Sequence, residues 1–245
     1  IHLKSFRELN IKITEEFGYI HCDATDMRPA DIILDIPSVG ATENIMLAAV
    51  CLNGTTIIRN AAKEPEILDL QILLNKMGAK VAGAGNSVIV IEGVKKLHAC
   101  EHTPMPDRIV AGTFLIAAAM CGGKLELRNV NPEHIYSLIS KFQKTACKLD
   151  VSDDKILVEA HGRIPAFETV ETMYYPGFPT DLQAQLMALQ TVSRGSSVII
   201  GNIFENRFEQ IPEFRRMGAK ITVSGRADMI RGVPYLNGAE VQAYD

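Results

Sequence analysis

Apolar and polar residues follow one pattern three times along this chain, and a glycine marks the same point in each copy. Gly54 and Gly123 lie 69 positions apart, and Gly195 lies 72 positions further on. Each glycine follows an apolar helical run and precedes a stretch of alternating apolar and polar residues, which is typical of a strand. We therefore expect each first helix to end at its glycine, because glycine accepts the left-handed conformation of a helix C-cap.

The second half of each copy predicts another helix followed by two short strands. Pro65 and Pro132 stand at the early helical position where a missing N–H costs nothing, and Gly78 and Gly218 are suited to end their helices. In the middle copy, one apolar face recurs at helical spacing: Ile135, Leu138, Ile139 and Phe142. The pattern predicts an α/β fold built from helix–strand–helix–strand–strand repeats.

Segments on either side resemble parts of further copies. Residues 5–22 have the pattern of a second helix and its closing strands, and residues 239–245 have that of a first strand. Residues 97–106 interrupt the repeats with histidines and prolines, as a junction does. We therefore predict two domains, residues 1–104 and 105–245, and we expect the chain to be a fragment or a processed product.

A proline-rich approach precedes the first helix of the third copy. Two prolines and a glycine within residues 176–179 fix an irregular path, so that Thr180 or Asp181 can cap the helix that follows. The apolar positions of this helix are Leu182, Leu186, Met187 and Leu189. A carboxylate at a helix start lies where the dipole favours its charged form. The alternative is that Asp181 serves only as a cap.

The first copy places another polar segment at the equivalent helix start. Gly40 lies 14 positions before Gly54, as Asp181 lies 14 positions before Gly195. Helix N-termini attract anions through unpaired N–H groups and the dipole. A chain that directs residues 38–40 and its other helix starts at one cleft can therefore hold a phosphorylated ligand without a basic patch.

Net charge and the length of the apolar runs argue against nucleic acids and membranes as partners. The 245 residues carry a formal charge of −4 with no long basic run, which argues against nucleic acid as the main partner. No apolar run approaches the roughly 18 to 20 residues of a membrane span, and residues 1–4 do not begin a secretory signal. We expect a cytoplasmic protein that does not bind membranes.

Cysteine and histidine spacing does not predict a metal site. The cysteines are far apart without CxxC spacing, and most lie in apolar contexts, so we expect buried free thiols rather than disulfides or ligands. They are Cys22, Cys51, Cys100, Cys121 and Cys147. His98 and His102 lie four positions apart, but no helical pattern surrounds them.

Four ordered motifs together carry a resemblance to a known family. They are residues 38–44, 61–67, 178–185 and 204–208. In these motifs the chain resembles the UDP-N-acetylglucosamine 1-carboxyvinyltransferases, and the likeness covers essentially the whole sequence. The resemblance implies a pair of inside-out, barrel-like α/β domains of the enolpyruvyl transferase type, each with threefold internal repetition.

The same resemblance implies an activity. The family transfers the enolpyruvyl group of phosphoenolpyruvate to the 3-hydroxyl of UDP-N-acetylglucosamine and releases phosphate, the reaction that opens peptidoglycan synthesis. No cofactor and no metal is implied. Asp181 resembles the residue that accepts the proton of the sugar hydroxyl, in a transfer coupled to carbon–oxygen bond formation.

The resemblance also implies a set of substrate-binding residues. Residues 36–40 match the loop that binds the nucleotide with main-chain donors, residues 203 and 204 match the sugar pocket, and residues 1–3 match the end of the uridine-binding stretch. The implied substrate-binding residues are Ile1, Ile36, Pro37, Ser38, Val39, Gly40, Ile203 and Phe204.

Three aromatic and charged positions in these motifs have a purely structural alternative. Phe204 and Phe208 could be ordinary core residues, and Arg207 could form an ion pair with Glu205 or another neighbouring acid. For Arg207 we favour the ion pair over a contact with the ligand.

The chain also departs from the family pattern. Ile36 stands where the family usually has a lysine, and none of the five cysteines lies in the glycine-containing loop that carries the family's general acid. That loop and most of the cations that hold phosphoenolpyruvate belong to segments before Ile1 and after Asp245. We therefore expect the isolated chain to be inactive, and we expect unpaired repeat faces that permit self-association.

Two alternative functions stay open. One is a non-catalytic nucleotide-sugar-binding or scaffold protein with the same repeats. The other is a relative such as the shikimate-pathway enolpyruvyl transferase or an RNA 3′-phosphate cyclase, against which the run at residues 178–185 argues.

Overall fold

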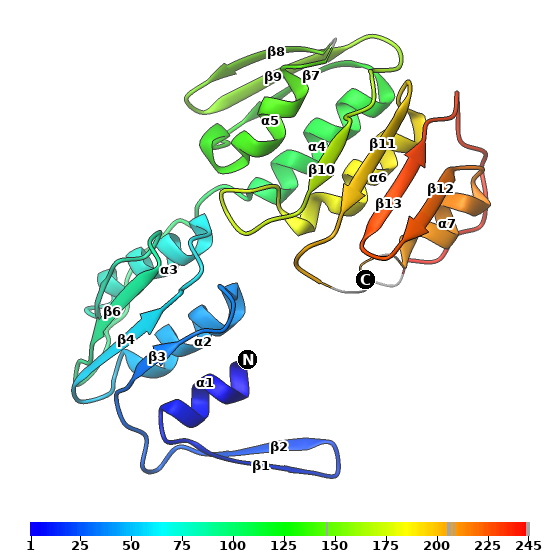
Figure 1. Cartoon of the computed structure of the whole chain (residues 1–245). Coiled ribbons are helices and arrows are strands. Elements are labelled where there is room, and N and C mark those ends of the chain that lie inside the picture. Colours follow the sequence, from blue (N-terminus) through cyan, green and yellow to red (C-terminus); the bar gives the residue numbers. More distant parts are fainter. Residues whose placement is uncertain (146, 205–206, 208, 244–245) are drawn as a thin grey trace. The chain divides into compact units, whose positions relative to one another are not determined.

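The chain divides into two compact units, Ile1–Met105 and Pro106–Asp245 (Figure 1). The computed structural model describes residues 1–145, 147–204, 207 and 209–243. The division falls inside the interrupted segment 97–106, one residue after the boundary predicted from the sequence. Each unit has its own buried apolar cluster, and each is described by itself below.

The first unit holds a two-stranded hairpin and a four-stranded sheet, with helices packed beside them. Its elements are α1 (His2–Glu8), β1 (Lys12–Glu16), β2 (Tyr19–Asp23), β3 (Asp31–Ile33), α2 (Val39–Ala49), β4 (Thr55–Arg59), α3 (Pro65–Lys76), β5 (Lys80–Ala82) and β6 (Val88–Glu92). The larger sheet has the order β3-β4-β6-β5, in which β3 and β4 are parallel and the other pairs are antiparallel.

The second unit holds a three-stranded and a four-stranded sheet. Its elements are α4 (Arg108–Cys121), β7 (Gly123–Arg128), η1 (Pro132–Ile135), α5 (Tyr136–Phe142), β8 (Lys148–Ser152), β9 (Lys155–Ala160), β10 (Thr169–Glu171), η2 (Thr180–Leu182), α6 (Gln183–Val192), β11 (Ser196–Ile200), α7 (Gln210–Arg216), β12 (Lys220–Ser224) and β13 (Ala227–Arg231). The sheets have the orders β7-β9-β8 and β10-β11-β13-β12.

The repeat predicted from the sequence is confirmed. The first copy (residues 31–93) and the third copy (residues 169–232) have the same strand order and the same pattern of parallel and antiparallel pairs. The second copy (residues 108–160) matches them from its first helix onward. The first helical turn begins 15 positions before the marker glycine in all three copies, at Val39, Arg108 and Thr180.

The role predicted for the marker glycines is wrong in detail. The first helices are capped at Val50, Gly122 and Ser193, so only the middle one ends at a glycine. The marker glycines instead lead into the following strand, with φ angles of 129° at Gly54, 103° at Gly123 and 112° at Gly195. Glycine is needed there because the turn from helix to strand passes through a conformation that other residues rarely adopt.

The second helices begin and end as predicted. Pro65 and Pro132 are the first residues of α3 and η1. Gly78 and Gly218 directly follow the C-caps of α3 and α7, with φ angles of 95° and 93°. The predicted apolar face of the middle copy is buried at Ile135, Leu138, Ile139 and Phe142.

The short flanking segments have mixed outcomes. The hairpin of β1 and β2, with α1 before it, confirms the second-half pattern predicted for residues 5–22. Residues 239–243 form no strand, which corrects the prediction made for 239–245, whose last two residues lie outside the described part. The Gln242 N–H donates instead to the Glu213 side chain, at 3.2 Å.

The prediction that the cysteines are buried is wrong for four of them. All five are free, but only Cys147 is buried, whereas Cys22, Cys51, Cys100 and Cys121 are exposed. Cys51 and Cys121 lie at the ends of helices whose apolar residues also cover an outward face. Periodicity alone does not distinguish such a face from the core.

An apolar stripe is exposed along α4. Val110 is 51% exposed and Phe114 is 54% exposed, and Ala117 and Cys121 continue the same face. In the described part of the chain, no group of three or more His, Cys, Asp or Glu side chains is placed to hold a metal ion. Nor does any helix in that part have the length and apolar character needed to cross a bilayer.

Candidate functional site

The helix start of the third copy does not use Thr180 or Asp181 as a cap, which corrects the prediction. A single 3₁₀ turn, η2, precedes α6, and its N-cap is the extended Pro179, without a side-chain hydrogen bond. Thr180 and Asp181 thus lie inside the first turn rather than in front of it. The alternative in which Asp181 is only a cap is wrong, and its carboxylate is available for other contacts.

The backbone around Asp181 is anchored by its neighbour in sequence. Leu182 is fully buried, and it packs against α4 at Gly112. A Cβ atom at Gly112 would lie 2.5 Å from a Leu182 methyl carbon, so the approach of η2 to α4 requires glycine. Asp181 follows the same turn outward, and half of its side chain is exposed.

Arg207 forms an ion pair with Asp181. Its Nη1 lies 2.7 Å from Asp181 Oδ1 and 3.3 Å from Thr180 Oγ1. The guanidinium carbon lies 4.8 Å from the centre of the Phe204 ring, within the range of a cation–π contact. The two residues are 26 positions apart in sequence. Arg207 places a positive charge beside the Asp181 carboxylate and fixes its orientation.

The structure decides two of the three structural alternatives, those for Arg207 and Phe204. Arg207 forms an ion pair, as we favoured from the sequence, but its partner is Asp181, 26 positions away, and Glu205 lies outside the described residues. Phe204 is 53% exposed, so its core alternative is wrong. Phe208 also lies outside the described residues, and Ile203 is partly buried.

A cavity of about 450 Å³ opens beside the ion pair. Most of the described residues that line it are of polar type: Thr180, Asp181, Gln183, Ala184, Gln185, Arg207, Glu209, Gln210, Gln242 and Ala243. The volume falls in the range of small-molecule sites. The paired carboxylate and guanidinium offer such a ligand one proton acceptor and one cationic donor at the same wall.

The helix start of the first copy is built differently, around a serine cap. Ser38 Oγ accepts the Ala41 N–H at 3.3 Å, and the Ser38 N–H donates to Ile36 O at 2.8 Å. The N–H groups of Val39 and Gly40 have no acceptor in the described chain. The main-chain donors open to an anion at this end of α2 are thus those of residues 39 and 40, and not that of Ser38.

The structure brings the start of the chain to this helix end. His2 Nδ1 lies 2.8 Å from Asn44 Nδ2, and a Cβ atom at Gly40 would lie 3.0 Å from the His2 ring. Ile1 is therefore close to residues 38–40. From the sequence, only the family resemblance implied that these residues belong to one site. Lack of a side chain at Gly40 leaves room for the imidazole against the first turn of α2.

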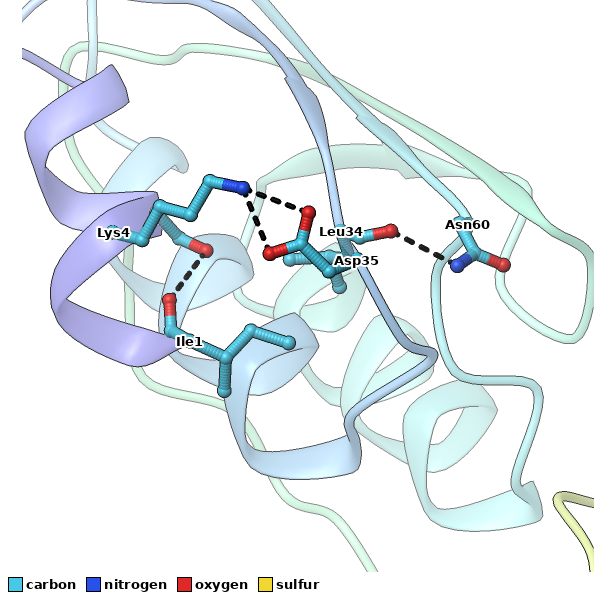
Figure 2. Close-up of polar contacts among 6 residues, drawn as sticks. Ile1, Lys4, Leu34, Asp35 and Asn60 are labelled. Carbon is cyan, nitrogen blue, oxygen red and sulfur yellow. Dashed lines mark hydrogen bonds and ion pairs between the residues drawn. The ribbon is translucent and has the colours of Figure 1, made fainter. Parts of the chain in front are cut away.

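Figure 2 shows how the loop before α2 is held. Lys4 of α1 contacts both carboxylate oxygens of Asp35 at 2.7 Å, and Asn60 donates to Leu34 O at 2.9 Å. The next residue is Ile36, where the resemblance described above implies a lysine, and its side chain is 46% exposed. Lys4 brings an ammonium beside this position, although Asp35 already pairs with it.

Glu43 adds a titratable group one turn into α2. Burial raises the pKa of Glu43 above its ordinary value, and the negative charge of Glu66 on α3 raises it further. Neither this group nor the contact between Arg207 and Asp181 was assigned from the sequence. Sequence spacing does not predict the proximity of Glu43 to Glu66 or of Arg207 to Asp181, because the two residues of each pair lie on separate elements.

The predicted site residues thus form two groups, one in each unit. Ile1, Ile36, Pro37, Ser38, Val39 and Gly40 gather at the start of α2 in the first unit. Asp181 and Phe204 are joined through Arg207 in the second unit, and Ile203 directly precedes Phe204 in the chain without lining the cavity.

Comparison with known proteins identifies relatives over the full chain. Residues 1–245 match the family EPSP synthase (3-phosphoshikimate 1-carboxyvinyltransferase). UDP-N-acetylglucosamine 1-carboxyvinyltransferase 2 of Caldanaerobacter subterraneus is 51% identical over 245 residues, which are 100% of this chain and 59% of that protein. The Bacillus subtilis protein of the same name is 49% identical over 244 residues, 57% of its length. The chain therefore spans less than two thirds of these relatives.

Solved structures share the fold. The enolpyruvyl transferase NikO from Streptomyces tendae has a TM-score of 0.81 at 20% identity, covering 95% of this chain and 58% of NikO. EPSP synthase from Acinetobacter baumannii has a TM-score of 0.64 at 17% identity, covering 96% of this chain and 57% of that structure. The enolpyruvyl-transferase type of α/β fold predicted from the sequence is confirmed.

Proposed function

This chain belongs to the EPSP synthase family, and we propose from that membership that it is part of an enolpyruvyl transferase acting on UDP-N-acetylglucosamine. The reaction moves the enolpyruvyl group of phosphoenolpyruvate to the sugar 3-hydroxyl and releases phosphate. Relatives about half identical to this chain are named for that reaction, which favours it over transfer to shikimate 3-phosphate. It would open peptidoglycan synthesis in the cytoplasm, and cell-wall growth, cell shape and division would depend on it.

The observation that carries the proposal is the carboxylate–guanidinium pair at the cavity of the third copy. In the proposed mechanism Asp181 accepts the proton of the 3-hydroxyl while the new carbon–oxygen bond forms. Because a carboxylate is a weak base toward an alcohol, the two events must be concerted, with water kept out. Arg207 orients the Asp181 carboxylate for this task, and it adds a positive charge where anionic groups approach.

The start of α2 serves the nucleotide in this proposal. The unpaired N–H groups of Val39 and Gly40, together with the helix dipole, suit the diphosphate of a UDP-sugar. Ile1 and Ile36 contribute apolar contacts beside it, and Ile203 and Phe204 contribute them to the sugar. Lys4 supplies the nearby cation if Asp35 releases it.

A chimera tests the activity. We would replace the matching 57% of the Bacillus subtilis relative with this chain and measure phosphate release from phosphoenolpyruvate and UDP-N-acetylglucosamine. The chimera should turn over, and Asp181→Asn should lower kcat by about 10²- to 10⁴-fold, the range of general-base catalysis. The matched control, Asp150→Asn on the exposed edge of β8, should leave kcat unchanged.

The same chimera separates catalysis from binding alone. A folded chimera that binds UDP-N-acetylglucosamine but releases no phosphate would favour the non-catalytic, nucleotide-sugar-binding alternative. Full activity of the Asp181→Asn chimera would contradict the role given to that carboxylate. Self-association through the α4 stripe of Val110 and Phe114 is part of the proposal only for the isolated chain.

A further inference from the structure

The three copies carry different charges at one position of their sheets. Glu92 of β6 and Glu159 of β9 correspond to Arg231 of β13, because each lies opposite the residue after the marker glycine. The strand on the other side presents a lysine to this position in every copy: Lys80, Lys148 and Lys220. The lysine is opposite a glutamate in the first and second copies, and opposite an arginine in the third.

The charge reversal removes an ion pair and leaves a repulsion. In the first copy Lys80 and Glu92 lie 3.7 Å apart as an ion pair. In the third copy Lys220 and Arg231 are directly opposite on neighbouring strands, an arrangement that is unfavourable for like charges. Neither Lys220 nor Arg231 has an acidic partner within 4.0 Å among the described residues.

A second substitution at the same place adds another cation. Asn75, at the end of α3, bonds to both the N–H and the carbonyl of Val81 at 2.8 Å. Its counterpart in the third copy is Arg215, which donates to Ile221 O from Nε at 3.1 Å and from Nη2 at 2.8 Å. The arginine thus replaces the donating half of the Asn75 contact but cannot accept the N–H of Ile221, and it adds a positive charge that Asn75 does not carry.

The three cations line one cavity of about 510 Å³ beside strands β11, β13 and β12 (yellow to red in Figure 1). Ser196, Ser197 and Met229 also line it, and no acidic residue does. Ser197 is 2% exposed, and its hydroxyl has no hydrogen-bond partner in the described chain. The cavity therefore combines cations with an apolar side chain, whereas the Ser197 hydroxyl belongs to the buried inner face of β11, opposite Ile230.

Asp228 is the nearest acid to this group, and it does not neutralise the cavity. Its side chain is fully buried, and Arg215 is the one of the three cations whose charge lowers the pKa of Asp228. It belongs to the inner face of β13, whereas Arg231 and Met229 alternate with it on the outer face. Lys220 and Arg231 are left without compensation.

We propose that this cavity is a second ligand site, independent of the function proposed above, and that it binds a small phosphorylated molecule. Lys220, Arg215 and Arg231 surround the phosphoryl group, and Met229 contacts the apolar part of the ligand. A phosphate or diphosphate suits the three cations because it offers several acceptor oxygens with two or more negative charges. The volume fits a metabolite rather than a segment of a protein.

Calorimetry with inorganic pyrophosphate on the 245-residue chain tests the site. Arg231→Glu restores the residue type that the first two copies carry, so the sheet tolerates it, and it should weaken binding by about tenfold or more. Arg215→Asn copies Asn75 and should weaken binding to a similar extent. Lys155→Glu makes the same change of net charge at an exposed residue, the first of β9, and it should alter the affinity less than about twofold.

Each other result overturns the assignment. Absence of pyrophosphate binding at millimolar concentration contradicts the site directly. Binding that survives Arg231→Glu places the anion elsewhere, for example at the start of α2. An equal loss in Lys155→Glu identifies a general charge effect, and binding of a short oligoglutamate without pyrophosphate identifies an acidic peptide surface instead.

Discussion

The first and third copies share a backbone plan and differ in the chemistry placed on it. Both have a parallel strand pair extended by an antiparallel hairpin, with a helix that starts 15 positions before the marker glycine. In the first copy that helix start is a serine cap with free N–H groups, and in the third it is an aspartate paired with an arginine. The comparison teaches that the repeat fixes where a site lies, while single side chains decide what the site binds.

Two glycines offer the strongest test of the shared plan. A Cβ atom at Gly93 would lie 1.3 Å from Leu52 O, and one at Gly232 would lie 1.8 Å from Ser193 O. Because backbone occupies the space in both copies, Gly93→Ala and Gly232→Ala should each cost more than about 4 kcal/mol of stability or prevent folding. Hydrogen exchange of peptides from each unit, compared with the unchanged chain, measures the two losses separately.

Gly238→Ala provides the matched control, since no atom lies within 4 Å of the added methyl group. Its exchange pattern should equal that of the unchanged chain. If either Gly93→Ala or Gly232→Ala left its unit protected, the two copies would not share this close backbone approach.

Asp228 marks the sharpest difference within the two cores. Ile89 and Ile156 occupy the equivalent buried positions of the first and second copies. Burial raises the pKa of Asp228 to about 6, and the nearby Arg215 opposes the rise. The folded chain therefore holds this proton more tightly than the unfolded chain, so stability falls as the pH rises from about 4 to about 6.

Replacement of this acid should be stabilising and dependent on pH. Asp228→Asn should raise the free energy of unfolding by about 1 to 3 kcal/mol near pH 8, where the buried carboxylate is charged, and by little near pH 4. Urea unfolding at both pH values measures the difference, with exposed Asp150→Asn as the control. An equal effect at both values would show that the charge of Asp228 is not what destabilises the core.

The two helix starts should respond differently to loss of their polar groups. Ser38→Ala removes a helix cap and should cost about 1 kcal/mol, whereas Ser38→Asn keeps the cap and should cost little. Asp181→Asn breaks only a half-exposed ion pair, so its cost should be below about 0.5 kcal/mol. Thermal unfolding compares the three variants.

A large loss of stability in Asp181→Asn would contradict the expected difference between the two helix starts. It would make the carboxylate a structural element of the third copy, as Ser38 is of the first. A loss of activity in Asp181→Asn could then result from unfolding, and it would not support the role of Asp181 as a proton acceptor.

The repeat and much of its framework could be predicted from local sequence patterns. Alternation and helical spacing predicted the order of elements, and the prolines and glycines predicted the ends of the second helices at Pro65, Pro132, Gly78 and Gly218. These features depend on local backbone preferences, which act between residues close in sequence and are therefore visible in it. The ends of the first helices were not predicted correctly, because these helices are capped at Val50, Gly122 and Ser193, before the marker glycines.

The contacts between side chains from distant segments could not be predicted in this way. Arg207 reaches Asp181 across 26 positions, His2 reaches Asn44 across 42, and Arg215 joins Lys220 and Arg231 at one cavity. The burial of the cysteines and of Phe204 also depends on tertiary packing, because an apolar residue in a helix or loop is buried only where another element covers it. Contacts between distant segments depend on packing, and the periodicity of a sequence carries no record of them.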